Sequence, residues 1–288
     1  MKLAYKVFEP VNGSNTLLPP LIFLHGLALS KEYWGNIPQI IANNTGRKAY
    51  APDARNHGES DWCEEFSDQL LMEDLLSFMD DIKAPKAVLI GHSVGGFIAC
   101  KAALAAPERV EMLFVEDMLA RKLDQEMFNH MVLVLKTLKQ VEPLILQGMD
   151  KEEVENFITA HVFQSMHPQV PLDQIFQDKP DIFYPLCKDS TGRYRFATNL
   201  DVVIKKIQDV DSIMKESNDI YNGATYFLYG TKSFLHVDKD EGHIRKRFPR
   251  AVLIAFEGAK HEIHRQFPEK FSATVIEWIQ LNQLLPKL

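Results

Sequence analysis

One short stretch of the sequence has the residue types and spacing of a nucleophilic site. Residues 91–96 read Gly-His-Ser-Val-Gly-Gly, directly after the apolar run Ala87–Ile90 and before the alanine-rich stretch Val94–Ala105. This is a G-x-S-x-G motif between a strand and a helix, where a serine hydroxyl projects from a sharp turn above a sheet. Glycines on both sides let the chain pack closely at such a turn. The motif therefore predicts that Ser93 is a nucleophile.

A serine hydroxyl is a poor nucleophile until a neighbouring base accepts its proton. His261 follows the apolar run Ala251–Phe256 through a short loop, and catalytic groups gather in loops at the carboxyl edge of a parallel sheet. We therefore expect His261 to be the base, with His264 as the alternative. The side chain of His92 should point away from the serine. Three further histidines should lie at the surface or line a cavity: His130, His161 and His167.

The base needs a carboxylate that fixes its tautomer and stabilises its charged form. Asp117 stands at the tip of the strand-like run Met112–Val115, whereas Asp238 lies in the loop after the run Ala224–Tyr229. A strand tip is a rigid platform, so we favour Asp117 and keep Asp238 as an alternative. Two other acids stay open as candidates: Glu116 and Asp240.

Acyl chemistry at a serine also needs donors for the negative charge that develops on the carbonyl oxygen. His25-Gly26-Leu27 follows the apolar run Leu21–Leu24, and a glycine there lets the chain turn its N–H groups toward the nucleophile. We expect the backbone N–H groups of Leu27 and Val94 to form this oxyanion hole. His25 is expected to be a structural hydrogen-bonding residue.

The elements that must position these residues alternate between strand-like and helix-like segments. Nearly all-apolar runs are typical of parallel strands that are covered on both faces. The expected strands are Met1–Phe8, Leu21–Leu24, Ala49–Ala51, Ala87–Ile90, Met112–Val115, Ala224–Tyr229 and Ala251–Phe256. The expected helices between them are Tyr33–Ala42, Ser67–Ile82, Val94–Ala105, Arg245–Phe248 with its N-terminal flank, and Glu269–Leu285. The alternation predicts an α/β fold with a mostly parallel central sheet flanked by helices.

The alternation breaks between about residues 118 and 222, where no strand is evident. Asp124–Gln140 carries apolar residues at helical spacing, and Asp150–His161 and Pro171–Gln177 also indicate helices. We expect a helical cap at 118–222, inserted into a core made of 1–117 and 223–288. Its Met, Phe and Leu content predicts an apolar pocket for an acyl chain.

Composition excludes several other classes of protein. The 288 residues are 46% hydrophobic and 25% charged with a net charge of −7, so the chain offers no global attraction for nucleic acid. The three cysteines form no paired motif, and neither a signal peptide nor a membrane-spanning run is evident. We expect a cytoplasmic protein in a reducing compartment and a monomer. No sequence motif implies a metal or an organic cofactor.

Together these residues resemble the α/β-hydrolase fold family over about residues 3 to 285. The segment Asp53–Ser60 reads Asp-Ala-Arg-Asn-His-Gly-Glu-Ser and is similar to the D-x-R-N-H-G-x-S hallmark of one subgroup. That subgroup contains bacterial acyl esterases and animal mitochondrial relatives described as sn-1-specific diacylglycerol lipases. The resemblance implies a cap after the sixth strand and a triad acid 24 residues after the nucleophile, which is Asp117. It also implies that Ser233 is a hydrogen-bonding helper and that mitochondria are an alternative location.

The chain departs from the subgroup beside the expected base. The subgroup motif commonly reads G-H-W-x-H, whereas Lys260 and Glu262 replace the glycine and the tryptophan here. The sequence predicts a serine hydrolase that cleaves carboxylic esters, such as acylglycerols, through an acyl-enzyme with the triad Ser93, Asp117 and His261. The two replacements keep one alternative open, a hydrolase-fold receptor that binds a ligand with little turnover.

Overall fold

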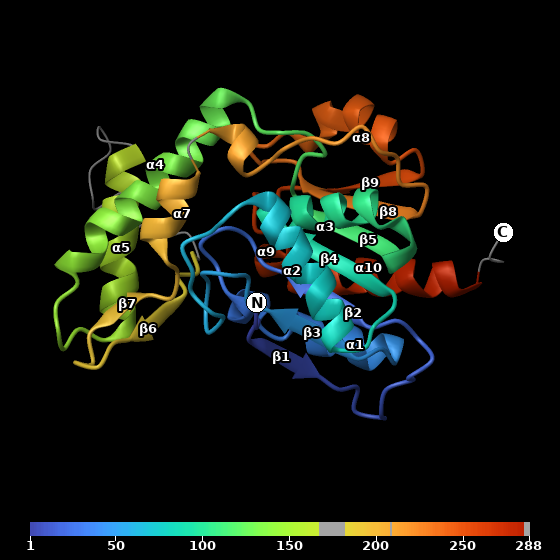
Figure 1. The fold of residues 1–288 in the computed structure, drawn as a ribbon, viewed down its shortest axis with the longest axis horizontal. Coiled ribbons are helices and arrows are strands. Elements are labelled where there is room, and N and C mark those ends of the chain that lie inside the picture. The colour runs from blue at the N-terminus through green and yellow to red at the C-terminus, as the bar shows by residue number, and fades with distance from the viewer. Residues whose placement is uncertain (167–181, 208, 285–288) are drawn as a thin grey trace.

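The computed structural model describes residues 1–166, 182–207 and 209–284, and its main element is a seven-stranded sheet (Figure 1). The strand order is β1-β3-β2-β4-β5-β8-β9, with β1 antiparallel to β3 and all other neighbours parallel. The strands are β1 (Tyr5–Phe8), β2 (Leu21–Leu24), β3 (Ala49–Pro52), β4 (Ala87–His92), β5 (Val110–Glu116), β8 (Ala224–Gly230) and β9 (Ala251–Phe256). The mostly parallel α/β sheet expected from the sequence is confirmed.

Helices cover both faces of this sheet. One face packs against α2 (Asp68–Asp81), α3 (Val94–Ala105) and α8 (Glu241–Arg247), and the other against α1 (Ile37–Thr45) and α10 (Pro268–Leu284). The short helix α9 (Ile263–Gln266) precedes α10. The 3₁₀ turns are η1 (Lys31–Trp34), η2 (Pro107–Arg109), η3 (Glu142–Leu144), η4 (Val210–Ser212) and η5 (Val237–Asp240).

Strand β4 lies in the middle of the sheet and is buried along its whole length. Its alternate side chains divide between the two faces, because Leu89 joins one hydrophobic cluster while Val88 and Ile90 join the other. Burial on both faces explains why Ala87–Ile90 of this strand are all apolar. The turn that follows β4 is therefore mounted on a strand that is buried at every residue.

The segment between β5 and β8 lies to one side of the sheet in Figure 1. It contains α4 (Gln125–Val141), α5 (Lys151–Met166) and α7 (Leu200–Lys206), together with the antiparallel hairpin β6 (Leu186–Lys188) and β7 (Tyr194–Phe196). The helices agree with the expected cap, whereas the hairpin was not expected. The division into a core and a cap at residues 118 and 222 stays a prediction.

Two expectations about the elements are wrong in detail. The inserted segment follows β5, the fifth strand in chain order, and not a sixth strand. The expected helix Tyr33–Ala42 is split into η1 and α1, because Gly35 adopts a φ of 52° that breaks the helical path. The expected helix Pro171–Gln177 and the residue His167 lie outside the described residues.

Parallel strands bring their carboxyl ends to one edge of the sheet, and this edge holds the candidate site. The chain leaves β4 into Ser93 and β5 into Asp117, and the loops after β8 and β9 carry Ser233 and His261. The ladder continues past the strand ends, since Ser93 N–H donates to the Glu116 carbonyl at 3.0 Å and Asp117 N–H to the Leu228 carbonyl at 2.8 Å. Neighbouring strands thus fix the spacing between the expected nucleophile and the expected acid.

Candidate active site

Ser93 occupies a strained turn between β4 and α3. Its backbone has φ 52° and ψ −126°, a conformation that a non-glycine residue rarely adopts. A Cβ atom at Gly95 would lie 2.3 Å from the Leu24 carbonyl oxygen, and one at Gly91 would lie 2.5 Å from the Gly95 carbonyl oxygen. Only glycine fits these two positions, which explains the spacing of the motif. Within the described residues, the Ser93 hydroxyl forms no hydrogen bond.

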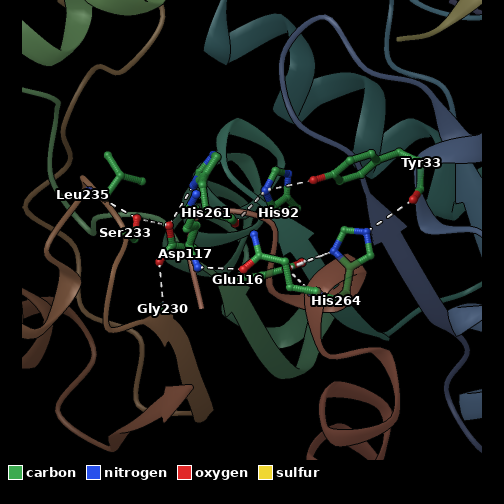
Figure 2. A network of polar contacts seen from close by, with 11 residues as sticks. Tyr33, His92, Glu116, Asp117, Gly230, Ser233, Leu235, His261 and His264 are labelled. Carbon is green, nitrogen blue, oxygen red and sulfur yellow. Dashed lines mark hydrogen bonds and ion pairs between the residues drawn. The ribbon is translucent and has the colours of Figure 1, made fainter. Parts of the chain in front are cut away.

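Asp117 and His261 form a close hydrogen-bonded pair at the carboxyl edge of the sheet (Figure 2). His261 Nδ1 lies 2.7 Å from Asp117 Oδ2, and the Asp117 side chain is fully buried. The same Oδ2 accepts the Ser233 hydroxyl at 2.5 Å, while Oδ1 accepts the Gly230 N–H at 3.0 Å. Three contacts therefore hold the carboxylate in one orientation.

The basicity of His261 follows from this pairing. Burial by itself lowers the pKa of His261, but the hydrogen bond to Asp117 and its negative charge outweigh burial. The pKa of His261 is therefore raised above the ordinary value of 6.5, and the charges of Glu262 and Glu116 act in the same direction. An imidazole with such a pKa is suited to accept and return a proton near neutral pH.

The two N–H groups expected to form the oxyanion hole are both free of protein partners in the part of the chain that the structure describes. Val94 is the first residue of α3, so its N–H has no intrahelical acceptor. Leu27 lies in the loop after β2, and both residues line the same cavity as Ser93. Their placement agrees with the expected role, which stays a prediction.

Two buried histidines brace the loop that carries Leu27. His25 Nδ1 lies 2.8 Å from the Gly26 carbonyl oxygen, which can only accept, so Nδ1 carries the hydrogen. The Gly26 carbonyl and the Leu27 N–H belong to one trans peptide and point in opposite directions. The bond from His25 therefore helps to turn the Leu27 N–H away from the protein core.

The second brace comes from the hallmark segment Asp53–Ser60. His57 Nδ1 lies 2.8 Å from the Arg55 carbonyl oxygen, and the Ala28 N–H donates to His57 Nε2 at 3.1 Å. Burial lowers the pKa of His57 to about 3, so the ring stays neutral and can accept this bond. Asp53 fixes the other end of the loop through Lys31, whose N–H and Nζ each lie 2.6 Å from its carboxylate. The segment supports the loop and does not enter the cavity lining.

A second acid–histidine pair lies beside the first and was not expected from the sequence. Glu116 binds His264, whose Nδ1 lies 2.9 and 2.8 Å from the two carboxylate oxygens and whose N–H donates to Oε1 at 2.8 Å (Figure 2). Both side chains are only 1% exposed. Sequence reasoning treated Glu116 and His264 as alternatives for the acid and the base, and the structure instead pairs them with each other.

His92 connects the two pairs. Its Nε2 lies 3.2 Å from the His261 carbonyl oxygen and 3.4 Å from the Tyr33 hydroxyl (Figure 2). Burial lowers the pKa of His92 well below its ordinary value, and the neighbouring His261 acts in the same direction. The neutral ring therefore donates from Nε2 to the backbone of His261 and helps to hold that loop.

The site opens into a cavity of about 850 Å³ between the sheet edge and the inserted segment. Ser93, His261, Leu27, Val94 and Ser233 all belong to its lining. The inserted segment contributes a mostly apolar wall that includes four methionines, a side chain that adapts easily to different apolar ligands: Met118, Met127, Met131 and Met166. The size and lining suit a ligand with a flexible hydrocarbon chain.

The remaining candidates lie elsewhere. Asp238 is exposed, and the buried Asp240 pairs with Arg121 at 2.8 Å, so the structure brings neither acid to His261. His130 lines the cavity, whereas His161 Nδ1 is bonded to the Phe157 carbonyl oxygen at 2.8 Å.

Two kinds of feature are absent from the described residues. They contain no group of three or more His, Cys, Asp or Glu side chains arranged to hold a metal ion. No helix among them is long and apolar enough to span a bilayer.

The fold and this site define a class of protein. The chain belongs to the α/β-hydrolase fold family, whose model matches residues 19–167. The sn-1-specific diacylglycerol lipase ABHD11 of Danio rerio is 29% identical over 281 residues, which cover 97% of this chain and 83% of the relative. The protein of the same name from Mus musculus is 26% identical over 283 residues, covering 97% and 85%. A solved structure described as a marine microorganism esterase superposes with a TM-score of 0.71 at 26% identity, covering 96% of this chain and 98% of that one.

Proposed function

We propose that the protein is a carboxylic ester hydrolase that forms an acyl-enzyme on Ser93. The observation that carries this proposal is the 2.7 Å contact between His261 Nδ1 and Asp117 Oδ2, at the edge of a cavity that Ser93 also lines. With the Nδ1 hydrogen held by Asp117, the lone pair of Nε2 is left to accept the Ser93 proton. The contact between a serine hydroxyl and its histidine base is commonly long in ligand-free enzymes and tightens when substrate binds.

In the first half of the reaction, Ser93 attacks the ester carbonyl while His261 takes the hydroxyl proton. The negative charge on the carbonyl oxygen is stabilised by the N–H groups of Leu27 and Val94, each of which contributes about 3 kcal/mol to lowering the barrier. Collapse of the tetrahedral intermediate breaks the bond to the alcohol, and the proton on His261 passes to the departing oxygen. Asp117 stabilises the transient imidazolium without taking a proton itself.

In the second half, His261 removes a proton from a water molecule, which attacks the acyl carbon. The same two N–H groups hold the second oxyanion. The acid leaves as Ser93 recovers its proton from His261, so the enzyme returns to its starting state without any cofactor.

The substrate class that the cavity favours is an ester with an apolar acyl chain. The methionine-rich wall from the inserted segment offers a hydrocarbon chain an apolar surface of adaptable shape. The names of the two relatives, which refer to a diacylglycerol lipase, support acylglycerol-like esters as substrates of this chain. Ser233 acts in this scheme by fixing the Asp117 carboxylate.

The proposal is tested by Ser93→Ala, measured as hydrolysis of p-nitrophenyl acyl esters of increasing chain length and as labelling by a fluorophosphonate probe. Loss of the Ser93 nucleophile should reduce kcat by a factor of about 10⁶ and abolish labelling. A Ser77→Ala variant on α2 serves as a matched control and should retain both signals. Undiminished labelling of Ser93→Ala would contradict the proposal. Acylation of the unaltered protein without release of the acid would favour the receptor alternative.

A further inference from the structure

The lining of the active-site cavity has two chemically different halves. The residues that the inserted segment contributes, between 118 and 184, are apolar except for His130 and the hydroxyl of Tyr184. The charged side chains come from the core segments after β8 and β9: Lys232, Lys260 and Glu262 lie in loops, and Arg265 lies in α9. The cavity is therefore amphiphilic, with a hydrocarbon side and a cationic side.

Two of these cations are held next to each other by backbone contacts. The Lys232 N–H donates to the Ala259 carbonyl at 2.9 Å, one residue before Lys260. A Cβ atom at Gly230 would lie 2.4 Å from the Lys260 carbonyl oxygen, so the two loops are in close contact. Lys232 directly precedes Ser233, and Lys260 directly precedes His261. Both lysines are thus exposed residues of the cavity lining, and their loops also carry Ser233 and His261.

The cavity lining carries an excess of positive charge, whereas the whole chain carries a net negative charge. The chain has a net charge of −7, whereas the cavity lining holds three cationic side chains and one carboxylate. Burial raises the pKa of Glu262, which weakens the one opposing charge. Arg265 lies 5.7 Å from the ring centroids of Tyr33 and of Phe183. Within the described residues, the ammonium groups of Lys232 and Lys260 form no ion pair. A local excess of positive charge in a concave site attracts anionic ligands.

The reaction itself determines which part of a substrate meets these lysines. His261 must hand its proton to the departing alcohol, so the alcohol leaves next to His261 and its chain neighbour Lys260. The acyl chain, which is bonded to Ser93 at that moment, takes the apolar side under the inserted segment. The cationic side therefore faces the alcohol.

We propose that Lys232 and Lys260 bind an anionic group, a phosphate or a carboxylate, on the alcohol part of the ester. This inference rests on the proposed ester hydrolase function and narrows its substrate class to amphiphilic esters whose leaving alcohol is charged. Ammonium groups that are exposed in the free protein become charge-assisted donors when the bound anion covers them.

The test compares esters that share an acyl chain and differ only in the charge of the alcohol. One pair is 1-octanoylglycerol and 1-octanoylglycerol 3-phosphate, and the other is the octanoyl ester of butanol and that of 4-hydroxybutanoate. Short chains keep all four compounds monomeric. For the unaltered protein, kcat/KM should be about tenfold higher for at least one anionic ester than for its neutral partner. The ratio should fall as ionic strength rises, because salt screens exposed charges.

The double variant Lys232→Ala/Lys260→Gly should bring this ratio close to one. Glycine is chosen at 260 because the related histidine motif has glycine there. Lys246→Ala on α8 removes one exposed positive charge outside the cavity lining and should keep the ratio of the unaltered protein. A ratio near one in the unaltered protein, or an equal fall in Lys246→Ala, would overturn the inference. Hydrolysis of none of the four esters by the folded protein would instead contradict the proposed function.

Discussion

The end of β5 carries two acid–histidine pairs of the same chemistry and opposite surroundings. Asp117 binds His261 at 2.7 Å, and its neighbour Glu116 binds His264 at 2.8 Å (Figure 2). The His261 side chain is 24% exposed and lines the cavity, whereas the His264 side chain is 1% exposed. The two acids are adjacent in the sequence at the end of β5, and the two histidines are three positions apart after β9.

The decisive difference lies at the second ring nitrogen. His264 Nε2 lies 3.3 Å from the Tyr33 carbonyl oxygen, so acceptors face both of its ring nitrogens. The His264 ring is buried and lies outside the cavity lining, so neither of its nitrogens faces a substrate. His261 has only its Nδ1 engaged within the described residues, which leaves Nε2 for the cavity. Under the proposed function, the pair at Asp117 is suited to proton transfer because the second ring nitrogen of His261 is left for the cavity, whereas that of His264 faces a backbone carbonyl.

The largest effect that separates the two pairs is expected from Asp117→Asn. The Gly230 N–H would bind the amide oxygen of the asparagine, so its NH₂ group would face His261 Nδ1 and force the ring into the wrong tautomer. We expect kcat for ester hydrolysis to fall about 10⁴-fold. Asparagine tolerates the positive φ of 46° at this position, so circular dichroism should show an intact fold.

Asp238→Asn is the matched control for this measurement, because it neutralises an exposed aspartate of the neighbouring loop. Its kcat should stay within about twofold of the original, as for most surface substitutions. If Asp238→Asn were the variant that lost activity, the assignment of the acid to Asp117 would be wrong.

The second effect concerns stability, for which His264 should matter more than His261, whereas His261 should matter more for activity. His264→Ala leaves the buried Glu116 side chain without its histidine partner, and we expect it to lower the free energy of unfolding by about 3–5 kcal/mol. His261→Ala should lower it by about 1 kcal/mol or less, because Asp117 keeps its bonds to Ser233 and Gly230. Urea unfolding followed by fluorescence measures both values. Equal losses in the free energy of unfolding would contradict the assignment of a structural role to the Glu116–His264 pair alone.

The smallest effect is a shift in the pH profile. His261 must be neutral to accept a proton, and its pKa is raised above 6.5, so kcat/KM should fall as the pH drops through that raised value. The negative charge of Glu262 helps to stabilise the imidazolium. Glu262→Gln should therefore move the acid limb to lower pH by a few tenths of a unit. A shift to higher pH in the Glu262→Gln profile would contradict this account of the charges around His261.

Much of the candidate site could be predicted from the sequence because the ends of the apolar runs indicate where the strands end. The apolar runs before Ser93 and Asp117 identify two parallel strands, and parallel strands deliver the residues that follow them to one edge. The motif spacing around Ser93 reflects a steric need for glycine at 91 and 95. These features are local, so a single sequence contains them.

The pairing of Glu116 with His264 could not be predicted, because it depends on how the chain turns after β5 and β9. Adjacent acids and two histidines three residues apart were visible as alternatives, but the direction of each side chain was not. The hairpin β6–β7 was missed for another reason. Its strands have three residues each, which is too short for an alternating pattern to emerge.

The inserted segment lies between β5 and β8, so it follows the strand whose end carries Glu116 and Asp117. Every group assigned to breaking the ester bond sits on the sheet framework, outside the stretch that encloses the hydrocarbon. Under the proposed function, substitutions in the inserted segment would therefore change the selectivity for the acyl chain and leave the groups that transfer the proton unchanged. Selectivity for the alcohol would depend on the loops that carry Ser233 and His261. Substitutions there would also disturb the proposed reacting groups, so fewer of them would be tolerated.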